Sequence, residues 1–445
     1  MKVKSFAFFF IVLLGTVLVP DLTFAASPNV VLILSDDQTP DSIPFMPYAS
    51  SHTGWVTFDR SFLNNPLCAP SRASILTGQY SHHTGVEENE NGPNENGPEV
   101  FDEDHTLATW LRNGGYHTGM VGKYLNGYPF GRGPYVPLGW DDWHVFAEAH
   151  YYNYNLIENG MRVHYGSNPA DYSTDVLASK AVTFINDAPS DKPFFLMFTP
   201  YAPHSPRTPA RRYLNALSRI RVFRRPNLDN IGIDLPRWVQ SLPDVTRKTM
   251  DKERRKQYRT VLALDDAIQS IFNALNTKGI LENTVVIYQS DNGYSFGSHR
   301  WVRKRCEYEE AIHVHMMVHY PGIATRNIGK LESNVDLAPT IADIAGVIPD
   351  VPVDGKSWKP LILEQPTKWR TGILIHGVKD STKLPITYWG IRTTAWKYVE
   401  IVETGEKELY DLQNDPYELT NLANEPGYEM RQANLATKLA NLRTS

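Results

Sequence analysis

The chain has 445 residues, of which 42% are hydrophobic and 21% are charged, and its formal net charge is −5. This composition is typical of a globular protein and excludes a disordered or fibrous chain. The acidic balance gives the chain no overall attraction for nucleic acid, and we expect no nucleic-acid partner. Two cysteines in a chain of this length exclude a fold held together by disulfides.

The N-terminus has the pattern of a secretory signal peptide over residues 1–25. Lys2 and Lys4 form a basic start, residues 6–19 are an apolar core too short to span a bilayer comfortably, and small residues lie at the cleavage positions of segment 23–25. Cleavage removes two lysines and one aspartate, so the net charge moves from −5 to −6. An uncleaved membrane anchor is the alternative. We expect an exported protein (periplasmic, extracellular or lysosome-like, depending on the host) with no membrane span after cleavage.

The remaining chain, 445 residues less the first 25, is longer than a single hydrophobic core usually allows. We expect a large domain over residues 26–365 and a smaller α+β subdomain over residues 366–445. Segments 390–399 and 407–412 have the pattern of antiparallel strands, and the turn at 414–416 leads toward a final helix. The smaller subdomain is therefore expected to be built on an antiparallel sheet.

Three continuous apolar runs predict buried strands in the large domain, at residues 29–35, 194–199 and 284–290. Unbroken apolar runs of this length are typical of parallel strands that are covered on both faces. Helix-like patterns lie between them, for example at 107–112 and 261–275. The large domain is therefore predicted to be an α/β domain with a mixed, mostly parallel sheet flanked by helices.

Polar side chains follow each of these runs directly or closely: Asp36 and Asp37, then His204, then Asp291 and Asn292. Open α/β sheets bind their ligands beyond the carboxyl ends of their strands. Ordinary strand-to-loop transitions explain one such instance better than three. We therefore expect one shared site, and the oxygen ligands in it suit Ca²⁺ or Mg²⁺ better than a thiophilic metal.

The most informative motif is Cys68-Ala69-Pro70-Ser71-Arg72, followed by Leu76-Thr77-Gly78. A cysteine nucleophile of the papain or caspase type would need a histidine framework that this chain lacks. The string resembles the signature of the type I sulfatases, C-x-P-S-R followed by L-T-G; a buried structural cysteine is the alternative. In that family a maturation enzyme oxidises the cysteine to Cα-formylglycine, whose hydrate replaces the thiol as nucleophile.

The resemblance implies an alkaline-phosphatase-like fold and a set of site residues. The family's catalytic positions correspond here to Cys68, Arg72, Lys123, His204 and Lys304. Its divalent cation, usually calcium, would be held by Asp36, Asp37, Cys68 in its converted form, Asp291 and Asn292. Taken singly, an arginine or lysine is more often a solvated surface charge, and a histidine is more often structural. Here the motifs that contain these residues occur together and in the order expected of the family.

Two further residues are expected to contact substrate, Asn126 and His299. Many sulfatases have a histidine shortly after the active-site lysine, where this chain has Leu125 and Asn126. A second departure is His315, which stands where the family usually has proline.

The resemblance is greatest to the N-acetylglucosamine-6-sulfatases and other glycosaminoglycan sulfatases. It implies hydrolysis of a sulfated carbohydrate, of the N-acetylglucosamine-6-sulfate type, or of an aryl sulfate, through a formylglycine sulfate hemiester. Two alternatives stay open: a phosphonate or phosphodiester hydrolase of the same fold, and a non-catalytic protein that binds sulfated glycans.

Three other features of the sequence carry expectations. The acidic segment 87–99 is expected to be a solvated loop, with a place at the substrate rim as the alternative. Segment 207–225 contains seven arginines and no acidic residue, and is either a rim that attracts polyanions or an exposed basic face. The Asp265-Asp266 pair is expected to be structural.

Overall fold

The computed structural model describes residues 27–91, 95–380 and 383–444, so the expected signal peptide lies outside the described residues. Within these ranges no helix combines the length and the apolar character needed to cross a membrane.

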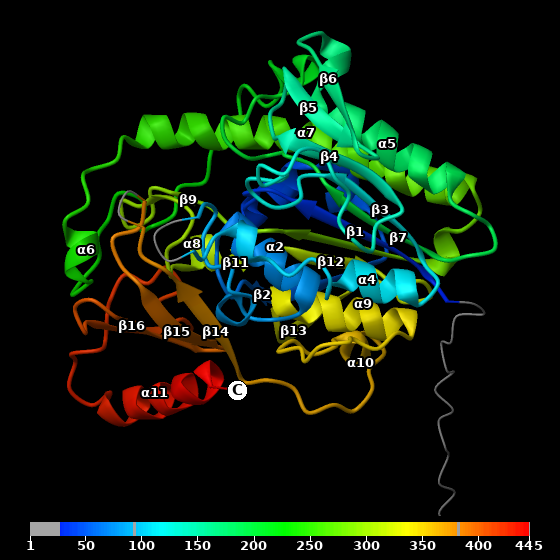
Figure 1. The fold of residues 1–445 in the computed structure, drawn as a ribbon. Helices are drawn as coiled ribbons and strands as arrows, with labels where there is room; N and C mark the ends of the chain where they lie inside the picture. The colour runs from blue at the N-terminus through cyan, green and yellow to red at the C-terminus, as the bar shows by residue number, and fades with distance from the viewer. Residues whose placement is uncertain (1–26, 92–94, 381–382, 445) are drawn as a thin grey trace, which may run out of the picture.

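Most strands of the described chain belong to one 11-stranded mixed sheet (Figure 1). Its strands are β1 (Asn29–Ser35), β2 (Trp55–Phe62), β3 (His117–Gly122), β4 (Asp142–Glu148), β5 (Tyr154–Glu158), β6 (Met161–Tyr165), β7 (Phe194–Thr199), β8 (Thr284–Ser290), β11 (His313–Val314), β12 (Met316–His319) and β13 (Arg326–Ser333). The order is β11-β2-β12-β8-β1-β7-β3-β4-β5-β6, with β13 paired to β2. β9 (Ser295–Phe296) and β10 (Val302–Arg303) form a separate two-stranded ribbon.

The central strands β8, β1, β7, β3 and β4 are parallel, and antiparallel strands extend both edges of the sheet. The predicted strands β1, β7 and β8 have the expected bounds. The mixed α/β sheet predicted from the sequence is therefore confirmed. Because these strands are parallel and in register, their carboxyl ends meet at one edge of the sheet.

Helices cover both faces of the sheet. They are α1 (Pro47–Ser51), α2 (Cys68–Thr77), α3 (Ser81–Thr84), α4 (Leu107–Asn113), α5 (Ser173–Asp187), α6 (Arg237–Gln240), α7 (Arg247–Thr277), α8 (Glu309–Ile312), α9 (Leu337–Ala345), α10 (Lys359–Ile362) and α11 (Glu429–Arg443). α5 and α7 lie over one face, while α2, α4 and α9 lie over the other (Figure 1). The alternation within β1 reflects this layering, because Val30 and Leu32 join the α2 side whereas Val31 and Ile33 join the α7 side.

The Asp265-Asp266 pair on α7 is structural, as expected. The Asp265 carboxylate accepts hydrogen bonds from the backbone N–H groups of Tyr48 (2.7 Å) and Ala49 (2.8 Å) in α1. These donors have no partner within so short a helix, so the carboxylate satisfies them and ties α1 to α7.

The C-terminal part contains a four-stranded antiparallel sheet of β14 (Gly372–Gly377), β15 (Tyr388–Thr393), β16 (Trp396–Ile401) and β17 (Lys407–Asp411). The expected antiparallel sheet is thus present. Segment 390–399 is divided by a turn into two paired strands, which the sequence pattern did not separate. α11 covers one face of this sheet, and the other face is turned toward the large sheet (Figure 1).

Candidate active site

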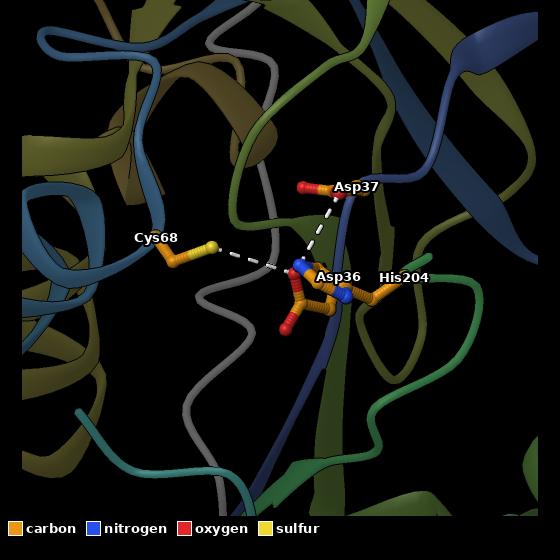
Figure 2. Close-up of side chains that lie close together, drawn as sticks. All are labelled: Asp36, Asp37, Cys68 and His204. Carbon is orange, nitrogen blue, oxygen red and sulfur yellow. Dashed lines mark hydrogen bonds and ion pairs between the residues drawn. The ribbon is translucent and has the colours of Figure 1, made fainter. Parts of the chain in front are cut away.

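Cys68 is the first residue of α2 and is fully buried. Its Sγ atom lies 3.5 Å from Asp36 Oδ1, and Lys304 Nζ donates to it at 2.6 Å. Figure 2 shows the thiol pointing toward the end of β1. Burial of the thiol, with the Asp36 charge adding to it, raises the pKa of Cys68 to about 11. The unmodified thiol is therefore protonated at neutral pH and is a poor nucleophile.

Two lysines reach the carboxylates that follow β1. Lys123 Nζ donates to Asp36 Oδ2 at 2.6 Å, and Lys304 Nζ donates to Asp37 Oδ1 at 2.6 Å. Burial alone would raise the pKa of the Asp36 carboxyl, but Lys123, His204 and the other nearby cations outweigh it and hold that pKa well below its usual range. Asp36 is therefore ionised, and the site concentrates both signs of charge in a small buried volume.

Arg72 lies one helical turn after Cys68 and is fully buried. Its Nε atom donates to Asp291 Oδ2 at 2.8 Å, and its Nη2 atom lies 3.4 Å from Asp36 Oδ2. Nη1 donates to the backbone oxygen of Lys123 at 2.5 Å. The guanidinium therefore joins three strand ends, and in this structure its contacts orient the two carboxylates and the lysine.

Lys123 depends on the glycine before it. Gly122 has a φ of 129°, and a Cβ atom there would lie 2.1 Å from the backbone oxygen of Thr199. Only glycine permits both the backbone angle and the close approach. The N–H of Lys123 donates to that same oxygen at 2.8 Å, so the Gly-Lys pair fixes where the lysine leaves the sheet.

The residues at the ends of β1 and β8 fit a hard cation. Asp36, Asp37, Asp291 and Asn292 are all buried, and Asn292 Nδ2 donates to Asp37 Oδ1 at 2.6 Å. The Oδ1 atom of Asn292 is buried without a hydrogen-bond partner among the described residues. An unpaired amide oxygen beside three carboxylates is the donor set that Ca²⁺ or Mg²⁺ prefers.

His204 faces the same cluster from the loop after β7 (Figure 2). Its Nε2 atom lies 3.6 Å from Asp37 Oδ2, and its Nδ1 atom lies 2.7 Å from the carbonyl oxygen of Ser205. A carbonyl oxygen only accepts, so Nδ1 carries a hydrogen and Nε2 is the nitrogen turned to the site. Burial lowers the pKa of His204 although Asp37 opposes this effect. An anionic substrate beside Nε2 would favour the protonated ring.

A cavity of about 680 Å³ opens onto Lys123 and His204. Its walls come from the loop after β3, from the end of β4 and from β6, and they include Asn126, Tyr128, Glu148 and Arg162. The Oδ1 atom of Asn126 is buried and has no hydrogen-bond partner in the part of the chain that the structure describes. Asn126 therefore lies where a substrate contact was expected, although that role stays a prediction.

His299 lies elsewhere. It is fully buried, its Nε2 atom is 3.3 Å from Asn227 Nδ2, and its ring packs on Tyr308 with the ring centroids 4.3 Å apart. Burial lowers the pKa of His299 to about 4, so the ring is neutral. The structure does not bring His299 to the cavity wall beside Lys123, and its proposed substrate contact stays a prediction.

His315, which stands where the family usually has proline, is also neutral. Burial lowers the pKa of His315 to about 3, and its ring packs on Tyr288 with the centroids 4.4 Å apart. The ring lies against a core tyrosine of β8, so its surroundings indicate a packing role.

The beginning of the acidic segment is not a solvated loop. Glu88 is buried and pairs with Arg305, the neighbour of Lys304, at 2.6 Å. Asn89 Oδ1 accepts a hydrogen bond from the N–H of Ala69, next to Cys68, at 2.9 Å. The segment thus supports both sides of the site. The sequence did not indicate these contacts, because each partner is distant along the chain.

The arginine-rich segment is largely neutralised by carboxylates from other elements. Four of its described arginines form ion pairs: Arg207 with Glu253, Arg212 with Asp175 and Asp266, Arg224 with Asp251, and Arg225 with Glu310. Arg211, Arg219 and Arg221 form no ion pair with any residue the structure describes. Only these three leave a net positive charge at the surface.

Two protein-family models match this chain. The family model described as Sulfatase matches residues 28–347, and the model described as N-sulphoglucosamine sulphohydrolase, C-terminal, matches residues 297–445. The chain belongs to the sulfatase family. It is an enzyme that hydrolyses sulfuric esters.

Several individual proteins of the family are similar to this chain over most of its length. Human N-acetylglucosamine-6-sulfatase is 34% identical over 89% of this chain and 81% of its own length. The extracellular sulfatase SULF-1 homolog of Drosophila melanogaster is 32% identical over 76% of this chain, which spans 31% of that protein. A structure solved in complex with its substrate D-glucosamine-2-N,6-O-disulfate superposes with a TM-score of 0.81 and 26% identity, covering 94% of this chain and 98% of that one.

Proposed function

We propose that this sulfatase removes the 6-sulfate from a sugar of the N-acetylglucosamine type, with a formylglycine made from Cys68 and a bound Ca²⁺ or Mg²⁺. The observation that carries the proposal is the convergence of Cys68, Lys304, Lys123 and His204 around the Asp36-Asp37 pair. Two of these residues, Lys123 and His204, also line a cavity of about 680 Å³. The likeness to N-acetylglucosamine-6-sulfatases supports the choice of sugar.

Each cation has a task that follows from its position. A sulfate ester is anionic, and more negative charge develops on the leaving oxygen as the S–O bond breaks. Lys123 and Lys304 are held beside residue 68, so their charges stabilise the sulfate oxygens without reorganisation. His204 presents Nε2 to the same space and is placed to donate a proton to the leaving alcohol.

Two groups are supplied to the site after folding or during maturation. When bound, the cation adds positive charge at the sulfate oxygens. Once converted, residue 68 offers a hydroxyl of its hydrate as the nucleophile. Arg72 holds Asp36 and Asp291 in place for the cation, and Gly122 fixes the direction of Lys123.

The cavity walls have the chemistry that binds a sugar. Asn126, Glu148 and Arg162 offer hydrogen-bonding groups to the hydroxyls of a sugar. Arg162 adds a positive charge at the rim, which suits a saccharide with a second anionic group. These features support a sulfated glycan as substrate. An aryl sulfate is smaller and needs only the contacts beside Lys123 and His204.

Export of the protein is part of the same proposal. The basic and apolar pattern of residues 1–25 supports it, as do relatives named extracellular sulfatases. A formylglycine-generating maturation enzyme would act on the chain before it folds, because Cys68 is fully buried in the folded protein.

The test is a substrate panel with the protein co-expressed with a formylglycine-generating enzyme. We expect sulfate release from N-acetylglucosamine-6-sulfate, faster than from the 3-sulfate of the same sugar, and slower release from an aryl sulfate. Preferential cleavage of the 3-sulfate would contradict the choice of position. Faster cleavage of a phosphonate monoester than of any sulfate would favour the alternative hydrolase of the same fold.

A further inference from the structure

Lys304 is presented by an unusual piece of backbone. Arg303 has a φ of 143° and Arg305 has a φ of 82°, so both neighbours of Lys304 adopt the left-handed side of conformational space without being glycine. Such conformations are costly and persist only where surrounding contacts hold them. Segment 303–309 therefore needs contacts from another part of the molecule to keep this conformation.

The C-terminal sheet makes hydrogen bonds along this segment. Tyr388 Oη on β15 donates to the backbone oxygen of Arg305 at 3.0 Å. Lys397 Nζ on β16 donates to the backbone oxygen of Glu307 at 2.7 Å. The backbone N–H of Glu309 donates to Glu418 Oε2, in the chain after β17, at 2.9 Å.

Side-chain contacts strengthen the same connection. Arg392 on β15 pairs with Glu309 at 3.0 Å, and Tyr308 Oη donates to Glu408 Oε2 on β17 at 3.0 Å. Lys397 is fully buried and also pairs with Glu418. A buried lysine that is held by carboxylates and a backbone oxygen cannot move easily, because its movement would leave these groups unpaired.

The two faces of the C-terminal sheet have different partners. Tyr388 and Tyr410 pack with Tyr308 and Trp301 on the side of segment 303–309. Tyr398 lies on the opposite face, in the cluster with Leu435 and Leu439 of α11. The α8 helix, which begins at Glu309, lies next to this sheet in Figure 1. One face of the sheet thus contacts the lysine segment, while the other packs on α11, Tyr80 and Val335.

We propose that the C-terminal sheet positions Lys304 for catalysis, and that Tyr388 is a positioning residue which acts through the backbone of Arg305. The proposal rests on the proposed function only in assigning Lys304 to the reaction. The C-terminal subdomain then contributes to catalysis, although none of its described side chains forms a hydrogen bond with Cys68.

The test compares Tyr388→Phe with Tyr398→Phe. Each change removes one hydroxyl from a fully buried tyrosine of the same sheet, and Tyr398 Oη donates to Glu400 rather than to the lysine segment. We expect Tyr388→Phe to lower kcat for an aryl sulfate about fivefold, the effect of one lost hydrogen bond on the placement of Lys304. Tyr398→Phe should leave kcat unchanged. The two variants should have similar melting temperatures.

Hydrogen–deuterium exchange supplies a readout that does not depend on turnover. Peptides covering residues 303–309 should exchange several-fold faster in Tyr388→Phe than in Tyr398→Phe. Peptides from α11 should not exchange faster in Tyr388→Phe than in Tyr398→Phe. Equal exchange in the two variants would overturn the proposal, as would faster exchange with an unchanged kcat. Absence of sulfatase activity in the unaltered, fully converted protein would instead overturn the proposed function, while the exchange comparison would still decide whether Tyr388 holds the segment.

Discussion

The Nζ atom of Lys304 lies 2.6 Å from the Sγ atom of Cys68, although 236 positions separate the two residues along the chain. A neutral thiol gains little from a buried ammonium group. An anionic sulfate held at residue 68 gains much more, because charge interactions are stronger in a buried site than in water. Lys304, which also pairs with Asp37 at 2.6 Å, is therefore placed where it can stabilise a sulfate at residue 68.

Replacing Cys68 by alanine should abolish turnover and leave the fold intact, because the nucleophile is lost and only a small side chain is removed. Cys306→Ala is the comparison, since Cys306 is also buried and free. It should keep measurable turnover with formylglycine at residue 68, and any loss should be limited to the effect of repacking segment 303–309. Activity assays and circular dichroism of both variants check this. Retained turnover in Cys68→Ala would contradict the mechanism. Cys68→Ser, with one hydroxyl, should accumulate sulfate on the serine, visible by mass spectrometry.

Removing the divalent cation should lower both kcat and the melting temperature. The carboxylates of Asp36, Asp37 and Asp291 are buried together, and a cation that binds only the folded state stabilises it by about 2.7 kcal/mol at 100 times its Kd. Differential scanning fluorimetry with a chelator, followed by Ca²⁺, measures the effect. Asp37→Asn should lose the Ca²⁺-dependent rise, and Asp265→Asn, outside the cluster, should keep it. Full activity in verified metal-free protein would rule the cation out.

Glu332→Gln should stabilise the protein at pH 8 and have little effect at pH 5. Burial, with Asp336 adding to it, raises the pKa of Glu332 to about 8. The folded protein therefore binds more protons than the unfolded chain between pH 4.5 and 8, so stability falls as pH rises through that window. Glutamine removes this loss, which is on the order of 4 kcal/mol at pH 8 for a shift of this size. Urea denaturation at both pH values measures it; equal changes at pH 5 and pH 8 would count against the raised pKa.

The unpaired arginines of segment 207–225 should assist capture of long substrates. Neutralising Arg211 and Arg219 together should raise KM for a sulfated oligosaccharide, most strongly at low salt, and leave an aryl sulfate unaffected. Arg212→Gln is the comparison, because Arg212 is held by Asp175 and Asp266; it should lower the melting temperature with a smaller effect on KM. If the double variant changes KM for both substrates alike, the arginines do not form a rim for polyanions.

The sequence predicted the central strands well because their runs are apolar throughout and bounded by polar residues, as in β1 and β8. It did not separate β15 from β16, since the turn residues Thr394 and Ala395 include no glycine, proline or asparagine to mark the turn. In edge strands such as β13, buried and exposed residues do not alternate regularly, and β13 also contains a bulge. The sequence of such a strand therefore shows no clear two-residue hydrophobic period. Local pattern thus identifies the covered centre of the sheet better than its edges.

The proximity of Asp36, Cys68 and Lys123 could be predicted, because these residues follow strands or belong to a motif; their roles stay predictions. The contacts that hold the site could not be predicted. Glu88 reaches Arg305, and Tyr388 reaches the backbone of the same residue, across long stretches of chain. Such pairs depend on how distant segments pack, which no local pattern of charge or hydrophobicity records.

The most direct test of the central claim is mass spectrometry of the proteolytic peptide that contains residue 68, taken from preparations of differing specific activity. We predict that the fraction of peptide carrying formylglycine or its hydrate in place of cysteine rises in proportion to kcat across the preparations. A fully active preparation in which residue 68 is entirely unmodified cysteine would contradict the account.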